Sequence, residues 1–196
     1  MTITYEIGNS LYLNITNKCP CDCTFCIRRL GDGVNPGENL RLEREPEMDE
    51  IIASLSERNL NKYGEIVFCG YGEATERLDV LIDIAKYLRT KNVRSIRLNT
   101  NGLSDLINKK KTVPLLAEVI DTISISLNAP NADVYNRLCA PVFGSGSYEA
   151  VIGFIKECTA AISHVTLSVF GGALDDEQIE ECRKINDSMG TVFRVR

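Results

Sequence analysis

The chain has 196 residues, and its 22 Lys and Arg against 27 Asp and Glu give a formal net charge of −5. This length fits one domain with a sizeable core, and 44% hydrophobic with 25% charged residues is typical of a globular protein. The acidity argues against sequence-independent binding to nucleic acid or to an anionic membrane. No apolar stretch approaches the roughly 18 residues of a membrane helix, and the N-terminus is unlike a signal peptide. We expect a single cytoplasmic domain over residues 1–196.

Strand-like and helix-like patterns alternate along the chain. The expected strands are residues 11–16, 65–69, 93–98, 122–127, 164–169 and 191–195. The expected helices are residues 75–91 (capped by Thr75), 114–120, 131–139, 147–162 and 175–189 (followed by Gly190 as a C-cap). Such alternation predicts parallel βα units, in a chain shorter than the roughly 250 residues of a full (β/α)8 barrel. We therefore expect an α/β fold, a partial (β/α)6 TIM-like barrel of parallel strands with helices outside. Residues 28–45 are the longest stretch without a pattern.

Chemically useful residues follow five of the expected strands, where active sites of parallel α/β folds gather. These strand ends carry the cysteine loop 19–26, the turns 70–73 and 99–102, the pair Ser126 and Asn128, and the turn 170–172. His164, the only histidine, begins its strand at the opposite end, and we interpret it as structural. Three-histidine zinc sites and histidine–carboxylate iron triads are therefore excluded within this chain.

Four of the eight cysteines lie within eight residues, in the run Cys19-Pro-Cys21-Asp-Cys23-Thr-Phe-Cys26. Without a secretion signal, such a group indicates metal binding rather than disulfides. Two ligand sets are open, with either Cys19 or Cys21 joining Cys23 and Cys26. Structural zinc sites commonly use two separated C-x2-C pairs, and the remaining cysteines are isolated. Thiolates also suit iron–sulfur clusters, and three of them leave one iron of a [4Fe–4S] cube open.

The spacing Cys19-x3-Cys23-x2-Cys26, with Phe25 before the last cysteine and a strand just before the loop, resembles the radical S-adenosylmethionine (radical SAM) superfamily. Length and local context are similar to its small TatD family-associated members. The resemblance implies that these three cysteines hold a [4Fe–4S] cluster. It also implies that SAM chelates the open iron and is cleaved reductively to a 5′-deoxyadenosyl radical, which abstracts hydrogen from an unknown substrate.

The same resemblance assigns SAM-binding residues. Gly70-Tyr71-Gly72-Glu73 is similar to the family's Gly-Gly-Glu motif for the SAM ammonium group, with Tyr71 in place of the second glycine. Glycine permits close backbone approach, and a carboxylate suits an ammonium ion. The other implied cofactor residues are Phe25, Asn99, Asn101, Ser126, Asn128 and Val169, the last packing with Phe170 against adenine. The resemblance assigns no further catalytic residue.

The expected partner is a one-electron donor similar to flavodoxin or ferredoxin. An open barrel permits a large substrate such as a protein, whereas the −5 charge argues against nucleic acid and no membrane partner is expected. Three alternatives stay open: an activase that installs a glycyl radical on a partner enzyme, a zinc module using Cys19, Cys21, Cys23 and Cys26, and a thiol redox protein using Cys23 and Cys26. Cys139 is expected to be a buried structural thiol, with radical quenching as the alternative.

Overall fold

A computed structural model describes residues 1–30 and 39–196 of the chain. Its strands are β1 (Thr4–Ile7), β2 (Ser10–Leu13), β3 (Glu65–Phe68), β4 (Ile96–Thr100), β5 (Thr122–Ser126), β6 (His164–Val169) and β7 (Val192–Val195). Its helices are α1 (Ile27–Leu30), α2 (Met48–Ser56), α3 (Leu78–Thr90), α4 (Ser104–Asn108), α5 (Val113–Ala117), α6 (Ala132–Cys139), α7 (Ser147–Ala161) and α8 (Asp176–Met189). Short 3-10 turns occupy Leu60–Lys62, Ala74–Arg77, Gly144–Gly146 and Gly171–Ala173.

The seven strands form one sheet whose order follows the chain, from β1 to β7. Strands β2 to β7 pair in parallel, which confirms the expected six-stranded α/β architecture. Strand β1 is an addition that pairs antiparallel with β2 through a turn in which Gly8 has φ 57°. With only four residues and its turn glycine, β1 gives a weak sequence pattern.

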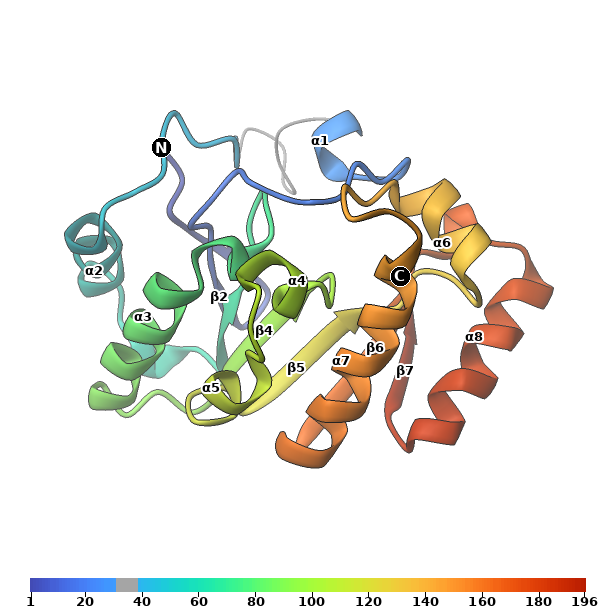
Figure 1. Cartoon of the computed structure of the whole chain (residues 1–196). Coiled ribbons are helices and arrows are strands. Elements are labelled where there is room, and N and C mark those ends of the chain that lie inside the picture. Colours follow the sequence, from blue (N-terminus) through green and yellow to red (C-terminus); the bar gives the residue numbers. More distant parts are fainter. Residues whose placement is uncertain (31–38) are drawn as a thin grey trace.

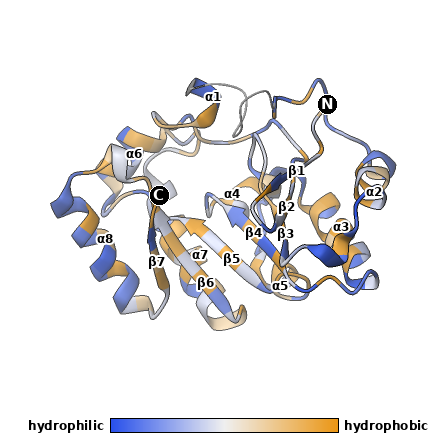
Figure 2. Ribbon diagram, turned by 180° about the vertical axis from the view of Figure 1, so that it is seen from behind, coloured by the Kyte–Doolittle hydropathy of each residue, from blue (hydrophilic) through white to orange (hydrophobic). Residues whose placement is uncertain are grey.

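The helices lie on one face of the curved sheet, as Figure 1 shows, and the view from behind in Figure 2 looks onto bare strands. Because helices cover one face of the sheet, buried residues alternate along strands such as β4 and β5 with residues that face the other side. In β4, Ile96 and Leu98 are fully buried beneath the helices, whereas Arg97 and Asn99 face the concave side. Among the described helices, none is long and apolar enough to cross a membrane.

Several expected boundaries were wrong. Strand β4 runs two residues further than expected, so Asn99 and Thr100 belong to the strand rather than to a turn. Thr75 does not cap a helix: Glu73 caps the 3-10 turn Ala74–Arg77, and α3 begins only at Leu78. Part of the expected unpatterned stretch 28–45 is helical in α1, and residues 31–38 lie outside the described residues. Gly190 is confirmed as a C-cap, with φ 67°.

Candidate cofactor site at the strand ends

The cysteine loop follows β2 and is paired along its backbone with residues 138–142, which form the end of α6 and the turn after it. The Asp22 N–H donates to the Cys139 carbonyl at 3.0 Å, and the Thr24 N–H donates to the Leu138 carbonyl at 2.9 Å. In return, the Val142 N–H donates to the Pro20 carbonyl at 2.9 Å. Residues 114 to 122 positions apart in sequence are thus joined by main-chain bonds, which fix the loop above the sheet.

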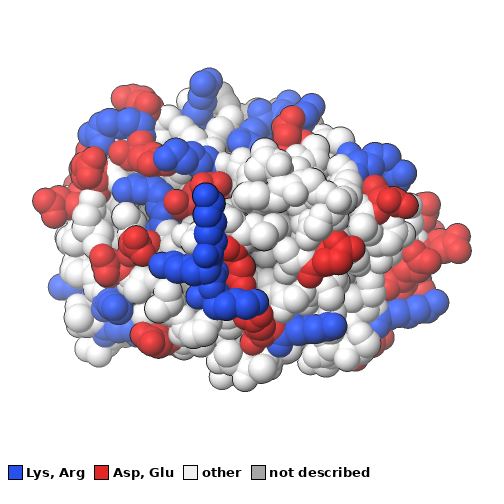
Figure 3. All heavy atoms as spheres, in the orientation of Figure 1, with Lys and Arg blue, Asp and Glu red and all other residues white. Residues whose placement is uncertain are grey.

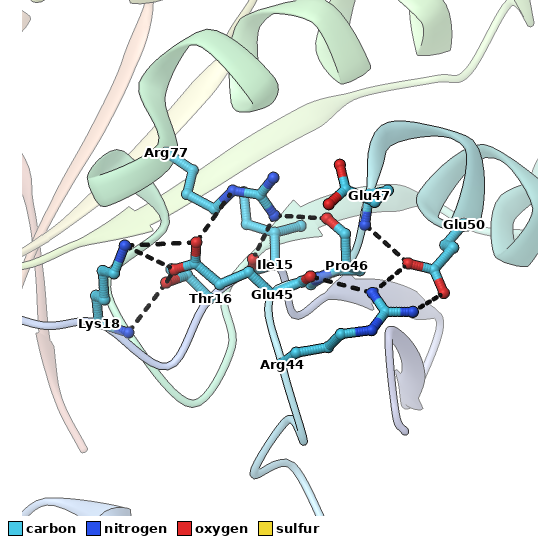
Figure 4. A network of polar contacts seen from close by, with 9 residues as sticks. All are labelled: Ile15, Thr16, Lys18, Arg44, Glu45, Pro46, Glu47, Glu50 and Arg77. Atoms are coloured by element: carbon cyan, nitrogen blue, oxygen red, sulfur yellow. Dashed lines mark hydrogen bonds and ion pairs between the residues drawn. The ribbon is translucent and has the colours of Figure 1, made fainter.

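A polar network holds the start of the loop, as Figure 4 shows. The Arg77 guanidinium donates to the carbonyls of Ile15 at 3.0 Å and Pro46 at 2.7 Å. The Thr16 hydroxyl donates to the Glu45 carboxylate at 2.7 Å and accepts from the Lys18 N–H at 3.0 Å. The exit of β2 is therefore tied to the segment that precedes α2.

All eight cysteines are free thiols, and those of the loop lie in a polar setting. The Asn101 amide nitrogen is 3.9 Å from the Cys19 sulfur and 4.0 Å from the Cys21 sulfur. Arg28 donates to the Cys26 sulfur at 3.4 Å and to the Cys21 carbonyl. The loop therefore offers its thiols both an amide donor and a cation.

Hydrogen bonds among the thiols shift their pKa values in opposite directions. Bonds from Cys139 and then Cys21, together with nearby Arg28, lower the pKa of Cys23 to about 4. A bond from Cys21 lowers the pKa of Cys19, whereas donation to Cys19 and Cys23 raises the pKa of Cys21. Because the thiolate is the form that binds metal, mutual hydrogen bonding within this group favours deprotonation of some of its thiols.

Gly70 and Gly72 pack against the segment that joins the end of β2 to the cysteine loop. A Cβ at Gly70 would lie 2.2 Å from Asn14 Oδ1, and one at Gly72 would lie 2.3 Å from the Lys18 carbonyl oxygen. The Gly72 N–H donates to the Thr16 carbonyl at 2.9 Å, and the Tyr71 N–H donates to Asn14 Oδ1 at 2.9 Å. Both glycines thus serve backbone approach to the cysteine loop.

Glu73 joins the ends of β3 and β4 from a buried position, 5% exposed. Its Oε1 accepts from the Thr75 N–H at 3.2 Å, the Thr75 hydroxyl at 2.8 Å and the Thr100 hydroxyl at 2.8 Å. Its Oε2 accepts from the Asn101 N–H at 2.7 Å, the only bond to that oxygen among the described residues. Burial raises the pKa of Glu73, and these donors oppose the rise. Glu73 therefore positions Asn101 beside Cys19 and keeps one acceptor site on Oε2.

A conservative change at this carboxylate tests that role. In Glu73→Gln, an amide NH2 group replaces one carboxylate oxygen and points at a group that donated a hydrogen bond to that oxygen. We therefore expect the free energy of unfolding to fall by about 1–3 kcal/mol. SAM affinity, measured by calorimetry, is expected to fall more than the iron bound after reconstitution. Glu76→Gln, at a half-exposed neighbour, is the matched control. Equal loss of SAM binding and of iron would contradict the assignment.

The remaining expected residues face the concave side or the loop. Asn99 Oδ1 is buried and has no hydrogen-bond partner among residues 1–30 and 39–196. Phe25 stacks on Phe170, with ring centroids 5.0 Å apart and planes at 14°. Val169 is fully buried. The apolar surface at this strand end therefore comes from the stacked rings of Phe25 and Phe170.

Ser126 and Asn128 meet a residue that the sequence analysis missed, Arg196. Its guanidinium is 3.3 Å from Ser126 Oγ and 3.4 Å from Asn128 Oδ1, and no described carboxylate forms an ion pair with it. Asn128 has φ 58°, and its amide nitrogen lies 3.7 Å from the Cys139 sulfur. Arg196 directly follows β7, so the rule applied to the other strand ends would have found it.

Two further residues were also missed. Asn14 is fully buried and bonds three backbone groups, of Thr2, Leu40 and Tyr71. Its position inside an apolar run concealed it, although a buried amide in a strand is itself a signal. Arg28 follows Cys26 by two residues, and a cation that close to a cysteine group is readable from sequence.

The residues present fit an iron–sulfur cluster and SAM. One loop supplies three thiols of the type that holds such a cluster. At the strand ends, Asn99 Oδ1, which has no hydrogen-bond partner among the described residues, and the Arg196 guanidinium offer an acceptor and a cation to a ligand that carries ammonium, carboxylate and hydroxyl groups. Within the described part of the chain, no three His, Cys, Asp or Glu side chains are already gathered around one metal position.

Comparison with known proteins gives concordant results. The model of the radical SAM superfamily matches residues 13–185. A curated "Probable GTP 3′,8-cyclase" of Methanocaldococcus jannaschii is 32% identical over 191 residues, which cover 95% of this chain and 57% of that protein. The chain thus spans little more than half the length of that relative.

Solved structures share the fold. Streptococcus suis SuiB bound to precursor peptide SuiA has a TM-score of 0.72 at 19% identity, over 95% of this chain and 38% of SuiB. SuiB bound to S-adenosylmethionine has a TM-score of 0.71 at 18% identity, over 95% and 40%. With the family match over most of its length and the thiol loop at the end of β2, this chain belongs to the radical SAM superfamily, whose enzymes use a [4Fe–4S] cluster and SAM.

Proposed function

We propose that this chain is a radical SAM enzyme that holds its cluster through Cys19, Cys23 and Cys26. The observation that carries the proposal is the loop after β2, where three thiols on a fixed backbone adjoin the Gly70–Glu73 turn. When bound and reduced, the cluster supplies one electron for cleavage of SAM, and the product radical takes hydrogen from a substrate.

The chain's own residues bind and orient the cofactors. Asn101 and Arg28 donate to the thiol group of ligands and stabilise their negative charge. The hydroxyl of Ser126 and the amide of Asn128 suit a ribose diol or a carboxylate, and Arg196 beside them suits a carboxylate. The stacked rings of Phe25 and Phe170 form a flat apolar surface of the kind on which adenine packs.

The shape of the sheet and one structural relative bear on the substrate class. The concave sheet face carries no described helix, so it is open to a large molecule (Figure 2). SuiB has the same fold, and in one of its structures it is bound to a precursor peptide, which is compatible with a protein substrate here. The M. jannaschii relative is named for a nucleotide substrate, but its length beyond this chain is considerable. We propose a protein or peptide rather than a nucleic acid, because the formal net charge of the chain is −5.

Anaerobic reconstitution with iron and sulfide tests the proposed function. We expect the reduced protein to convert SAM to methionine and 5′-deoxyadenosine slowly without added substrate, as measured by chromatography and mass spectrometry. Metal analysis of the same sample separates the zinc alternative. Stoichiometric zinc without iron or sulfide, or a cluster whose spectrum does not change with SAM, would contradict the proposal.

A further inference from the structure

A fifth cysteine faces the cysteine loop across the backbone pairing described above. Cys21 and Pro141 form an isolated antiparallel bridge between the loop and the turn after α6. Two residues away along each segment, the same pairing brings Cys23 opposite Cys139, 116 positions later in the chain. The Cys23 sulfur lies 3.9 Å from the Cys139 carbonyl oxygen, and the two thiols form a hydrogen bond. Residues opposed in an antiparallel pair have Cα atoms about 4.5–5.5 Å apart, which is within the roughly 4.4–6.8 Å that a disulfide spans.

The two thiols of this pair differ in their surroundings. Cys139 is 1% exposed, and its sulfur lies 3.7 Å from the Asn128 amide nitrogen. Figure 3 shows the face over the loop between α6 and α7, which follows Cys139, as largely free of charged side chains. Cys23 is half-buried, and Arg28 lies beside the thiols of its loop. A partly exposed thiol near a cation reacts with an oxidant before a buried thiol does. An oxidant in solution therefore reaches Cys23 first, and Cys139 stands behind it as the second thiol.

Cys26 is the alternative partner of Cys23, since the two belong to one C-x2-C pair. The Cys26 N–H donates to the Cys23 carbonyl at 3.1 Å, so the backbone between them forms a turn. The Cys26 sulfur, however, accepts a hydrogen bond from Arg28 Nε at 3.4 Å. The Cys23 sulfur is instead in contact with Cys139, whose hydrogen bond lowers the pKa of Cys23 more than any other group does. The geometry thus favours the long-range pair over the local one.

We propose that Cys23 and Cys139 form a reversible disulfide when the cluster-free protein meets a disulfide oxidant such as oxidised glutathione. The Cys23 thiolate attacks one sulfur of the oxidant, whose S–S bond breaks and releases one glutathione thiol. Cys139 then attacks the mixed disulfide, forms the new S–S bond and releases the second glutathione thiol. The pair loses two electrons and two protons, and the oxidant gains them. The consequence for loading rests on the proposed function: while Cys23 is in a disulfide it cannot bind iron, so the oxidised chain must be reduced before a cluster assembles.

Peptide mapping of the apoprotein tests the pair directly, because trypsin separates the two cysteines into residues 19–28 and residues 138–156. The apoprotein is equilibrated without air in glutathione buffers of increasing oxidised fraction, then alkylated and digested without reductant. By mass spectrometry we expect these two peptides to become linked, and dithiothreitol to separate them again. Cys23→Ser is expected to leave Cys139 unlinked. Cys182→Ser removes another fully buried thiol, on α8, and as the matched control it is expected to keep the linked peptides.

The unaltered chain alone can overturn the inference. A Cys139 that stays open to alkylation at every glutathione ratio, or a disulfide that joins Cys23 to Cys26, would do so. Glutathione attached to Cys23 without any linked peptide would overturn it as well. Protein reconstituted with iron and sulfide is expected to show at least about fivefold less linked peptide than apoprotein at the same glutathione ratio, because its Cys23 is bound to iron. Reduced protein that binds no iron would instead contradict the proposed function, and the mapping of the apoprotein would still report on the disulfide.

Discussion

Cys23→Ala is expected to abolish both cluster assembly and 5′-deoxyadenosine formation. Cys23 is the loop thiol whose pKa is held at about 4, by bonds from Cys139 and Cys21 and by the charge of Arg28. A cube held by three thiolates loses one of its protein ligands in this variant, and the other two lie on a loop too short to compensate. Iron and sulfide content and the visible spectrum after anaerobic reconstitution measure the first loss. Cys19→Ala and Cys26→Ala are expected to behave in the same way.

Cys21→Ser is the matched control for these three variants. Cys21 is buried, 4% exposed, in the same loop, and its raised pKa marks it as a donor to its neighbours. Serine keeps a donor there, so we expect iron content and SAM cleavage to be retained. If Cys21→Ser loses the cluster and Cys19→Ala keeps it, then Cys21 rather than Cys19 is the third ligand.

Gly72→Ala is expected to give the largest loss of stability in the chain's turns. Its Cβ would lie 2.3 Å from the Lys18 carbonyl oxygen and 2.7 Å from the Asn17 carbonyl carbon, and both are backbone atoms. Since neither atom can rotate away, the loop itself must shift, which costs about 3 kcal/mol in the free energy of unfolding, the upper end of the range usual for overpacking. Urea unfolding of the apoprotein measures this cost, and reduced iron uptake is expected to accompany it.

Gly153→Ala supplies the comparison for that variant. Gly153 lies within α7, and a Cβ there meets nothing within 4 Å. Alanine favours a helix over glycine, so this variant is expected to stabilise the chain by about 1 kcal/mol. If Gly72→Ala unfolds at the same urea concentration as the unaltered chain, the close packing of the turn on the cysteine loop is not a constraint.

The sequence was sufficient for the order of the six parallel strands, because each is a short apolar run bounded by polar or glycine residues. Strand β6 matches its expected residues 164–169 throughout. The hairpin strand β1 was missed because four residues give too little periodicity. Helix α2, with nine residues, was missed as well, since no element was expected within residues 46–64. Local pattern therefore predicts elements that repeat the βα unit, and loses those that depend on an individual turn.

At the site, residue identity was readable but contact geometry was not. The cysteine spacing indicated a cluster, yet the pairing of the loop with residues 138–142 is long-range and leaves no local trace. The expected approach of Gly70 and Gly72 to a ligand stays a prediction, and what the sequence did not indicate is their close packing on Asn14 and Lys18. The position of Arg196 after the last strand was readable from the sequence, but its contacts with Ser126 and Asn128, 70 and 68 positions earlier in the chain, were not.

The anchoring of the cysteine loop at both of its flanks has an entropic consequence for cofactor loading. Main-chain bonds to residues 138–142 and the Arg77 network restrict the loop in the folded apoprotein. Ordering a residue's backbone costs roughly 1–2 kcal/mol, and here that cost is incurred during folding rather than when iron arrives. The backbone of the loop is thus ordered before iron and sulfide arrive, and loading requires chiefly that the thiol side chains turn toward a common centre, because no three of them are gathered there among the described residues.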